Sequence, residues 1–387
     1  MMFPAKKLQN KSLLYTLLLF IFLYIWRSVN KKSKLIFAKT ENNLALLKKC
    51  PTILKKVFLP TIYLQHSLLQ SMFASLLPPK GTSFKYSIEE VTMEGGGHTN
   101  IAWVHYNGKH SEASQNELLV LLLPGITGSA EENYIKDLAL ALCRSNYRCA
   151  VYHTRMNSSK LVLPNEGYVD IVKDFKTTID YIKEREPSIK IFGIGHSYGA
   201  NLLLNYLGTY VDNSVFIGGV SLANPFNFML GESKARRSVV NSKIAECLHQ
   251  VVDRSKKDLA DAINFKLNLE ELKSYSTVRE FDKNFTIRIY GYQTVDDYYW
   301  DASSCRRLRF IKVPIFMLQA EDDPISDVNS FVQEEIESYN ANVIVMITPR
   351  GGHQGWIEGF FMLKRWYIKP TLEFLEAVLR SECRQYQ

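Results

Sequence analysis

Six short runs of mostly apolar residues recur along the chain from about Glu117 onward. They are Leu119–Leu123, Arg148–His153, Ile189–Ile194, Phe216–Leu222, Pro314–Leu318 and Val343–Ile347. Most lack the polar alternation of a half-exposed strand, which is typical of parallel strands buried on both faces. Helix-like segments separate the runs, and this alternation predicts one α/β domain with a mostly parallel, doubly wound sheet.

The N-terminus carries a different apolar segment. Between Lys11 and Arg27 the chain is uncharged and mostly Leu, Phe, Ile and Tyr, and lysines flank it on both sides. The segment is shorter than the roughly 20 residues that span a typical bilayer, so a cleaved signal peptide is the alternative. No small-x-small cleavage site follows it. The pattern therefore favours a single-pass signal anchor with its basic flank over residues 1–34, in the thinner bilayer of the endoplasmic reticulum or a related endomembrane.

A second apolar segment, Val57–Leu77, contains Gln65, His66 and Gln70. Polar residues at these positions fit a helix packed on the catalytic domain, and they fit equally a helix lying in the membrane surface. Both interpretations stay open from the sequence. We expect residues 35–115 to form an N-terminal extension with this helix and the first strands, and residues 116–380 to form the catalytic domain.

Composition narrows the possible partners and cofactors. The 387 residues carry a net charge of +8, but Lys and Arg are dispersed and much of the excess lies near the N-terminus. Contact with anionic lipid explains this better than nucleic-acid binding does. The six cysteines include no C-x-x-C pair, which argues against a metal site and a disulfide scaffold. We predict no cofactor, no metal and no obligate protein partner.

One predicted strand runs directly into a serine between glycines. Residues 195–199 read G-H-S-Y-G, after the run Ile189–Ile194 and before the helical apolar pattern Ala200–Leu207. This is the context of a nucleophile elbow, in which a tight strand-to-helix turn presents the serine hydroxyl above the sheet. Ser197 is therefore the candidate nucleophile. Taken alone, the motif would also fit a serine that merely caps a helix.

A candidate base follows the last predicted strand. Val343–Ile347 is followed by G-G-H, and His353 is the one histidine of eight that lies after the candidate acids. His196 neighbours the nucleophile in the turn, so its side chain is expected to point away from the serine hydroxyl. The order nucleophile, acid, base is that of α/β-hydrolases and differs from the chymotrypsin and subtilisin orders.

The candidate acid lies in a carboxylate-rich turn after Pro314–Leu318, where residues 321–324 read E-D-D-P. Neighbouring side chains in an extended turn point in different directions, so only one of the two aspartates can reach the His353 imidazole. We predict Asp323, because the acid in this fold is commonly followed by a short Pro/aliphatic step such as P-I-S at 324–326, where Pro324 fixes the backbone leaving the turn. The alternative is Asp322.

This set of residues fits nucleophilic catalysis. A serine hydroxyl is a weak nucleophile near neutral pH, so an imidazole must take its proton and a carboxylate must orient that imidazole. An oxyanion hole is also needed. The strand Leu119–Leu123 leads into P-G-I-T-G, and in this fold the loop there and the residue after the nucleophile donate backbone N–H groups. We assign these donors to Ile126 and Tyr198.

Several further segments carry a resemblance to a known family. They read L-L-L-P-G-I-T-G at 121–128, G-H-S-Y-G-A-N at 195–201, R-E-F-D at 279–282, D-D-Y-Y at 296–299 and G-G-H at 351–353, with Glu358 and Gly359 beyond. With these segments the chain, from about Cys50 to Trp366, resembles the α/β-hydrolase domain-containing proteins of types 1, 2 and 3, a group of membrane-anchored lipid esterases.

The resemblance implies an α/β-hydrolase fold in which residues from about 224 to 303 form a helical cap over the pocket. It also implies lipid esters as substrates, either acylglycerols or glycerophospholipids, and a membrane as partner. Three aspartates before the acid strand, Asp282, Asp296 and Asp297, could suggest metal ligands or a rival acid. We interpret them as helix caps or partners of arginines, because hydrolysis through Ser197 needs no metal.

The chain departs from the family pattern at a few positions. It has Arg155-Met156 where relatives tend to have Arg-Gly, and residues 101–103 read I-A-W where relatives often have L-D-W. These departures put the pocket wall in question and leave the reaction unaffected. Glu358 stands where an aspartate would complete an H-x-x-x-x-D acyltransferase pattern.

The sequence thus predicts a membrane-anchored serine hydrolase that cleaves carboxylic esters of lipids through an acyl-serine intermediate. The alternative, from another functional class, is a non-catalytic membrane binding or receptor protein that keeps the fold. The presence of Ser197, Asp323 and His353 in the required order argues against this alternative, because loss of one of them is the usual sign of such a change.

Overall fold

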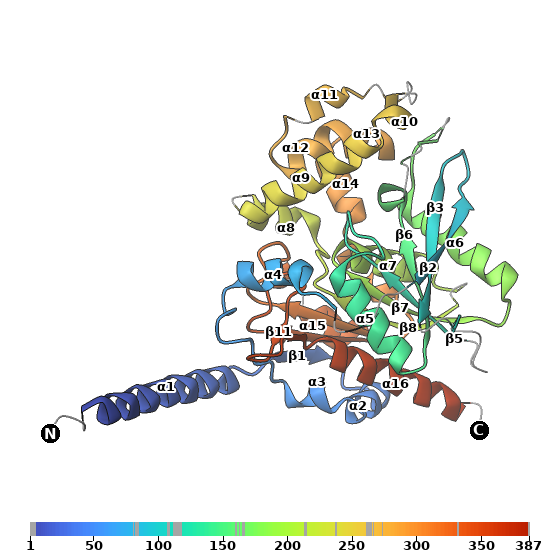
Figure 1. The fold of residues 1–387 in the computed structure, drawn as a ribbon. Coiled ribbons are helices and arrows are strands. Elements are labelled where there is room, and N and C mark those ends of the chain that lie inside the picture. The colour runs from blue at the N-terminus through green and yellow to red at the C-terminus, as the bar shows by residue number, and fades with distance from the viewer. Residues whose placement is uncertain are drawn as a thin grey trace.

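The computed structural model describes residues 5–385 except 80, 82–84, 107–108, 111–117, 159–160, 162, 165–166, 213–214, 237, 261–264, 266, 273 and 331–332. In this part of the chain ten strands form one sheet, in the order β1-β10-β9-β8-β7-β5-β6-β3-β2, with β4 paired to β3 (Figure 1). Their bounds are β1 Lys34–Phe37, β2 Lys85–Thr92, β3 His98–Tyr106, β4 Lys109–His110, β5 Leu118–Leu123, β6 Arg148–His153, β7 Lys190–His196, β8 Phe216–Leu222, β9 Ile315–Ala320 and β10 Val343–Thr348.

All six strands predicted from the apolar runs are present, as β5 to β10, and they run parallel to one another. Antiparallel strands extend the sheet at both edges, β1 beside β10 and β3 beside β6. The α/β prediction is therefore confirmed. The predicted boundary between residues 115 and 116 lies outside the described residues, and the division into three segments stays a prediction.

Helices cover both faces of the sheet, because successive side chains of a strand point to opposite faces. Val120 and Leu122 pack into the core under α2 Glu41–Lys48, α3 Pro51–Lys55, α5 Asn133–Arg144 and α16 Ile368–Gln385. On the opposite face, Leu119 and Leu121 pack against α6 Ile171–Arg185, α7 Tyr198–Thr209 and α15 Gln333–Tyr339. Burial on both faces explains why the strands read as unbroken apolar runs.

A helical segment connects β8 to β9 and lies beyond one end of the sheet (Figure 1). Its helices are α8 Phe228–Ala235, α9 Val239–Arg254, α10 Lys256–Ala260, α11 Leu269–Leu272, α12 Val278–Phe281, α13 Ile287–Tyr290 and α14 Val295–Ala302. Buried residues such as Leu248, Phe281 and Phe285 give it a core of its own. The helical segment contributes side chains to the cavity above Ser197, which is described below.

The N-terminal helix α1, Ala5–Asn30, projects away from the rest of the molecule (Figure 1). No helix in the described part of the chain combines the length and the apolar character needed to cross a membrane. The predicted single-pass anchor is thus not supported. The physical reason is length, since the charge-free apolar stretch Leu13–Trp26 is about 21 Å long at 1.5 Å per residue, against about 30 Å of bilayer hydrocarbon.

The second apolar segment contains helix α4, Ser67–Leu76, which packs against the hairpin of β11, Ile357–Glu358, and β12, Lys364–Arg365. The Gln70 amide is fully buried and bonds to both backbone groups of Ile357, at 3.3 Å and 2.7 Å. The Arg365 guanidinium donates to the carbonyls of Ala74 and Leu77 at the end of α4. The inner side of this helix therefore packs on the domain, which was one of the two open interpretations.

Candidate active site

The sharp turn between β7 and α7 places Ser197 above the sheet. Ser197 has φ 52° and ψ −119°, a conformation that L residues rarely adopt and that is found at nucleophile elbows. The flanking glycines are required sterically. A Cβ on Gly195 would lie 2.4 Å from the Ala200 Cα, and one on Gly199 would lie 2.2 Å from the Leu123 carbonyl oxygen. The motif is thus explained by the packing of backbone against backbone.

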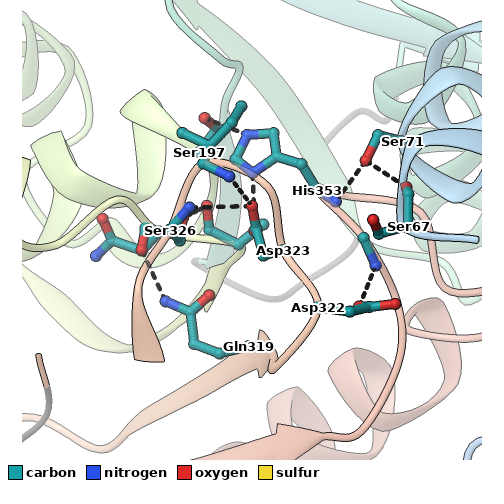
Figure 2. Close-up of polar contacts among 12 residues, drawn as sticks. Ser67, Ser71, Ser197, Gln319, Asp322, Asp323, Ser326 and His353 are labelled. Atoms are coloured by element: carbon teal, nitrogen blue, oxygen red, sulfur yellow. Dashed lines mark hydrogen bonds and ion pairs between the residues drawn. The ribbon is translucent and has the colours of Figure 1, made fainter. Parts of the chain in front are cut away.

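The structure brings the three predicted catalytic residues together (Figure 2). His353 Nε2 lies 2.8 Å from Ser197 Oγ, and His353 Nδ1 lies 2.9 Å from Asp323 Oδ2. The Asp323 side chain is fully buried, and its other oxygen accepts the N–H groups of Ile325 and Ser326. These bonds hold the carboxylate in one orientation, so that it can fix the tautomer of the imidazole.

Asp322 takes a different part in the same site. Its Oδ1 accepts the Gly352 N–H at 2.9 Å, one residue before the candidate base. Burial raises the pKa of this carboxyl, the Gly352 N–H lowers it, and the neighbouring Asp323 charge raises it. The loop carrying His353 is also held from α4, because the His353 N–H donates to Ser71 Oγ at 2.8 Å (Figure 2).

The loop after β5 lies opposite the elbow. Tyr134 Oη accepts the Gly125 N–H at 3.1 Å, and the buried Asn157 amide donates to the Gly125 carbonyl at 3.3 Å. Ile126 and Tyr198 line the same cavity as Ser197. Among the described residues, the structure shows no protein acceptor for the N–H of either one. Both N–H groups therefore stay candidates for the oxyanion donors.

His196, next to the nucleophile, is fully buried and lies between the rings of Tyr134 and Tyr367. Burial, assisted by the Arg365 charge, lowers the pKa of this imidazole to about 3, so it is neutral at physiological pH. It is part of the core beneath the elbow and contacts neither Ser197 Oγ nor Asp323 in the structure, as the sequence predicted for a residue in the turn.

A cavity that is partly open to solvent lies between Ser197 and the helical segment. Most of its lining is apolar or aromatic, including Phe228, Ile244, Val278 and Ile325. A cavity of this kind beside a nucleophile is the expected form of a site for a hydrophobic substrate. Among the described residues, no group of three or more His, Cys, Asp or Glu side chains is placed to hold a metal ion.

The three aspartates of the helical segment have separate roles. Asp296 forms an ion pair with Arg279 at 2.7 Å, and Asp297 accepts from Thr294 at the start of α14, in agreement with the interpretation as cap or partner. The Asp282 carboxylate accepts from Thr286 Oγ1 and Tyr299 Oη and lines the cavity. Burial raises the pKa of this carboxyl, and among the charges near it Arg279 lowers the pKa. Asp282 lies on a single π-helical turn, which the sequence does not reveal.

The Asp282 carboxyl makes the free energy of unfolding depend on pH. Burial raises the pKa of its carboxyl from 3.8 to about 6, so the carboxyl binds its proton more tightly in the folded state than in the unfolded state. Its stabilising contribution is complete below about pH 4 and is lost as the pH rises to about 6, a change of about 3 kcal/mol at most. Relative to Asp282→Asn, the parent should lose unfolding free energy over this interval in chemical denaturation. Parallel pH curves for the two proteins would contradict this prediction.

The fold and this arrangement define the class: the protein is an α/β-hydrolase. Residues 115–358 match the family Hydrolase_4, described as serine aminopeptidase S33, and the chain belongs to that family. Among solved structures, an esterase of Pyrococcus furiosus, Pf2001, is similar in fold, with a TM-score of 0.50 and 18% identity over 77% of this chain and 95% of that one.

Curated relatives include lipid esterases. Phospholipase ABHD3 of Bos taurus is 28% identical over 92% of this chain and 87% of its own length. Human monoacylglycerol lipase ABHD2 is 22% identical over 94% of this chain and 91% of its own length. The resemblance inferred from the motifs is therefore confirmed, and the protein is a carboxylic ester hydrolase with lipid esterases among its homologues.

Proposed function

We propose that the protein is a serine esterase that cleaves carboxylic esters of lipids. The observation that carries the proposal is the bridge formed by His353 between Ser197 Oγ and Asp323, at the wall of a largely apolar cavity. The substrates are the acyl esters of acylglycerols or glycerophospholipids. The apolar lining and the lipid esterases among the relatives support this class of substrate.

The geometry supports a two-step reaction. His353 Nε2 takes the proton of Ser197 Oγ as the oxygen attacks the ester carbonyl, and the Ile126 and Tyr198 N–H groups stabilise the oxyanion. The imidazolium, held by Asp323, then gives its proton to the leaving alcohol, and an acyl-serine remains. Water, deprotonated by the same imidazole, attacks the acyl group, which releases the fatty acid and returns the proton to Ser197.

In this proposal the helical segment is the cap of the enzyme. Phe228, Ile244 and Val278 come from α8, α9 and α12, and all three side chains face the cavity that holds the Ser197 hydroxyl. Water exclusion by these side chains strengthens the electrostatic interactions at the reacting carbonyl. The cap also gives an acyl chain apolar surface to contact.

The experiment that tests the function is fatty-acid release by the purified full-length chain, measured by mass spectrometry. The substrates are a panel of monoacylglycerols, diacylglycerols, phosphatidylcholines and lysophospholipids in mixed micelles, with Ser197→Ala as control. Release from at least one class, absent in the control, is the expected result. Turnover of water-soluble esters only, with no lipid cleaved, would reject the lipid part of the proposal and keep the esterase.

We also propose that α1 attaches the enzyme to membranes through its exposed apolar side chains. Leu13 is 72% exposed and Phe20 65% exposed, and each such side chain gains about 1.5–3 kcal/mol on leaving water. Full-length protein should sediment with membranes at neutral pH and physiological salt, and removal of residues 1–32, which keeps β1, should release a substantial share. A chain lacking only residues 1–10 is the matched control. Recovery of the full-length chain in the supernatant would contradict the attachment.

A further inference from the structure

A group of large apolar side chains is exposed on the β11–β12 hairpin and the neighbouring segment of α4. Phe361 is 91% exposed and Met362 74%, and no described segment covers them. We call the group the apolar face. It consists of Tyr63, Leu69, Met72, Phe360, Phe361 and Met362, each at least 37% exposed. Water contact over so many adjacent apolar side chains is unfavourable and marks interaction sites on soluble domains.

Hydrogen bonds and ring contacts hold the side chains of the apolar face in position. Tyr63 Oη donates to the Phe360 carbonyl at 2.6 Å, and the two rings meet edge to face with centroids 6.2 Å apart. Thr61 Oγ1 donates to the Gly359 carbonyl at 2.8 Å, which fixes the start of the hairpin loop. The Phe361 ring packs edge to face on Phe360. These bonds hold the exposed rings in place before any partner arrives.

Helix α4 connects this face to the catalytic histidine. Leu69 and Met72, three residues apart, lie on its outer side, whereas Gln70 is fully buried against the β11 backbone. Ser71, on the same helix, accepts the His353 N–H at 2.8 Å. The apolar face is therefore separated from the loop that carries His353 by a single helix.

The end of α1 lies beside residues 58–65, the segment that carries Tyr63 of the apolar face. Tyr24, Arg27 and Lys31, at the end of α1, line a small cavity together with Gln65 and Arg350. Gln65 follows the Tyr63 segment, and Arg350 donates to the Gln65 carbonyl at 2.7 Å. Helix α1 leaves the body of the molecule on the side where α4 and β11 lie (Figure 1).

Basic side chains lie near the apolar face. Lys31 is exposed at the junction with α1, and the Lys364 side chain, 63% exposed beside the hairpin loop, forms an ion pair with Glu358 at 3.0 Å. Basic side chains around exposed aromatic and aliphatic residues complement a surface of anionic lipid head groups over hydrocarbon. A protein partner would not require the adjoining apolar helix.

We propose that the apolar face docks on an anionic lipid bilayer, with Phe361 and Met362 inserted below the head groups. This inference rests on the proposed lipid esterase function and adds to it the surface through which the enzyme reaches its substrate. Docking would set the molecule on the bilayer with the His353 loop one helix from the lipid surface, so that the ester is taken from the bilayer without passing through bulk water.

The test is sedimentation of the full-length chain with vesicles of roughly four parts phosphatidylcholine to one part phosphatidylserine. All proteins carry Ser197→Ala, so that the lipid stays intact and binding is measured independently of activity. Phe361→Glu and Met72→Glu should each raise the lipid concentration that sediments half of the protein by about tenfold or more. Ile88→Glu is the matched control, since Ile88 is 54% exposed on β2 at the opposite edge of the sheet.

Unchanged vesicle binding by Phe361→Glu and Met72→Glu would overturn the docking proposal. So would light scattering that shows a dimer of the parent and a monomer of these variants, because the face would then join two copies of the chain. In the active background, the variants should lose rate on vesicle substrate about tenfold and keep the rate on a water-soluble short-chain ester. Loss of both rates to the same extent would also count against docking, and an inactive parent would reject the proposed function alone.

Discussion

Replacing Ser197 with alanine is expected to abolish both ester hydrolysis and covalent labelling by a fluorophosphonate. The hydroxyl lies 2.8 Å from the His353 imidazole and is the atom that would form the acyl bond. The oxyanion hole and the cavity remain in the variant, but without a nucleophile the rate should fall by roughly four to six decades. Labelling is read by gel fluorescence and mapped by mass spectrometry of the modified peptide.

Ser129→Ala is the matched control for this experiment. Ser129 follows the oxyanion loop, and its hydroxyl accepts the Glu131 N–H, so its removal leaves the proposed catalytic groups in place. This variant should label and hydrolyse as the parent does. Undiminished turnover by Ser197→Ala would reject the nucleophile. A folded parent that neither labels nor hydrolyses any ester would favour the alternative of a non-catalytic protein with this fold.

The sheet was largely predictable because burial on both faces leaves an unambiguous pattern. Residues 118–123 are all buried in β5, and the corresponding sequence is uninterrupted Leu and Val. The edge strands are different. β2 mixes exposed and half-buried residues with one buried residue, Val91, in no regular order, so its sequence carries no comparable signal. Strand order likewise depends on contacts between distant segments, such as the pairing of β1 with β10, which local periodicity does not encode.

The candidate site residues were inferred from the order of motifs along the chain, whereas no motif predicted the groups that hold them in place. Ser71 supports the His353 backbone across 282 positions of sequence, and Asn157 reaches the Gly125 carbonyl from the loop after β6. Serine and asparagine occur in many loops, and neither has a motif of its own. No sequence pattern predicted that Tyr134 would accept the Gly125 N–H. Only the folded arrangement identifies such contacts.

The apolar length of α1 shows where sequence reasoning was misled. The predicted anchor was inferred from a charge-free segment between lysines, and its shortness was accepted for the thinner bilayer of the endoplasmic reticulum, but no helix of the described residues has the length and apolar character to cross a membrane. The charge-free stretch of α1 is too short for that, and the structure adds exposed apolar side chains at the hairpin, such as Phe361, that the sequence did not suggest. A membrane span requires about 20 apolar residues in a row, whereas attachment by an exposed apolar surface does not.

The two adjacent aspartates are expected to differ by several decades in their effect on the catalytic rate. Asp323 Oδ2 is 2.9 Å from His353 Nδ1, and its other oxygen is fixed by the Ile325 and Ser326 N–H groups. In Asp323→Asn the side-chain amide can donate to Nδ1, which would hold the imidazole in the tautomer whose Nε2 cannot accept the serine proton. The rate should fall by about four decades.

Asp322→Asn is the matched variant, since it removes the neighbouring charge and keeps an oxygen in the same place. Asp322 Oδ1 accepts the Gly352 N–H, and an asparagine carbonyl can accept it equally well. The His353 loop therefore keeps its support, and the rate should stay within about tenfold of the parent. Both variants are compared by turnover of a soluble ester and by thermal unfolding. If Asp322→Asn is the inactive one while the two unfold at similar temperatures, the carboxylate that orients His353 during the reaction is Asp322.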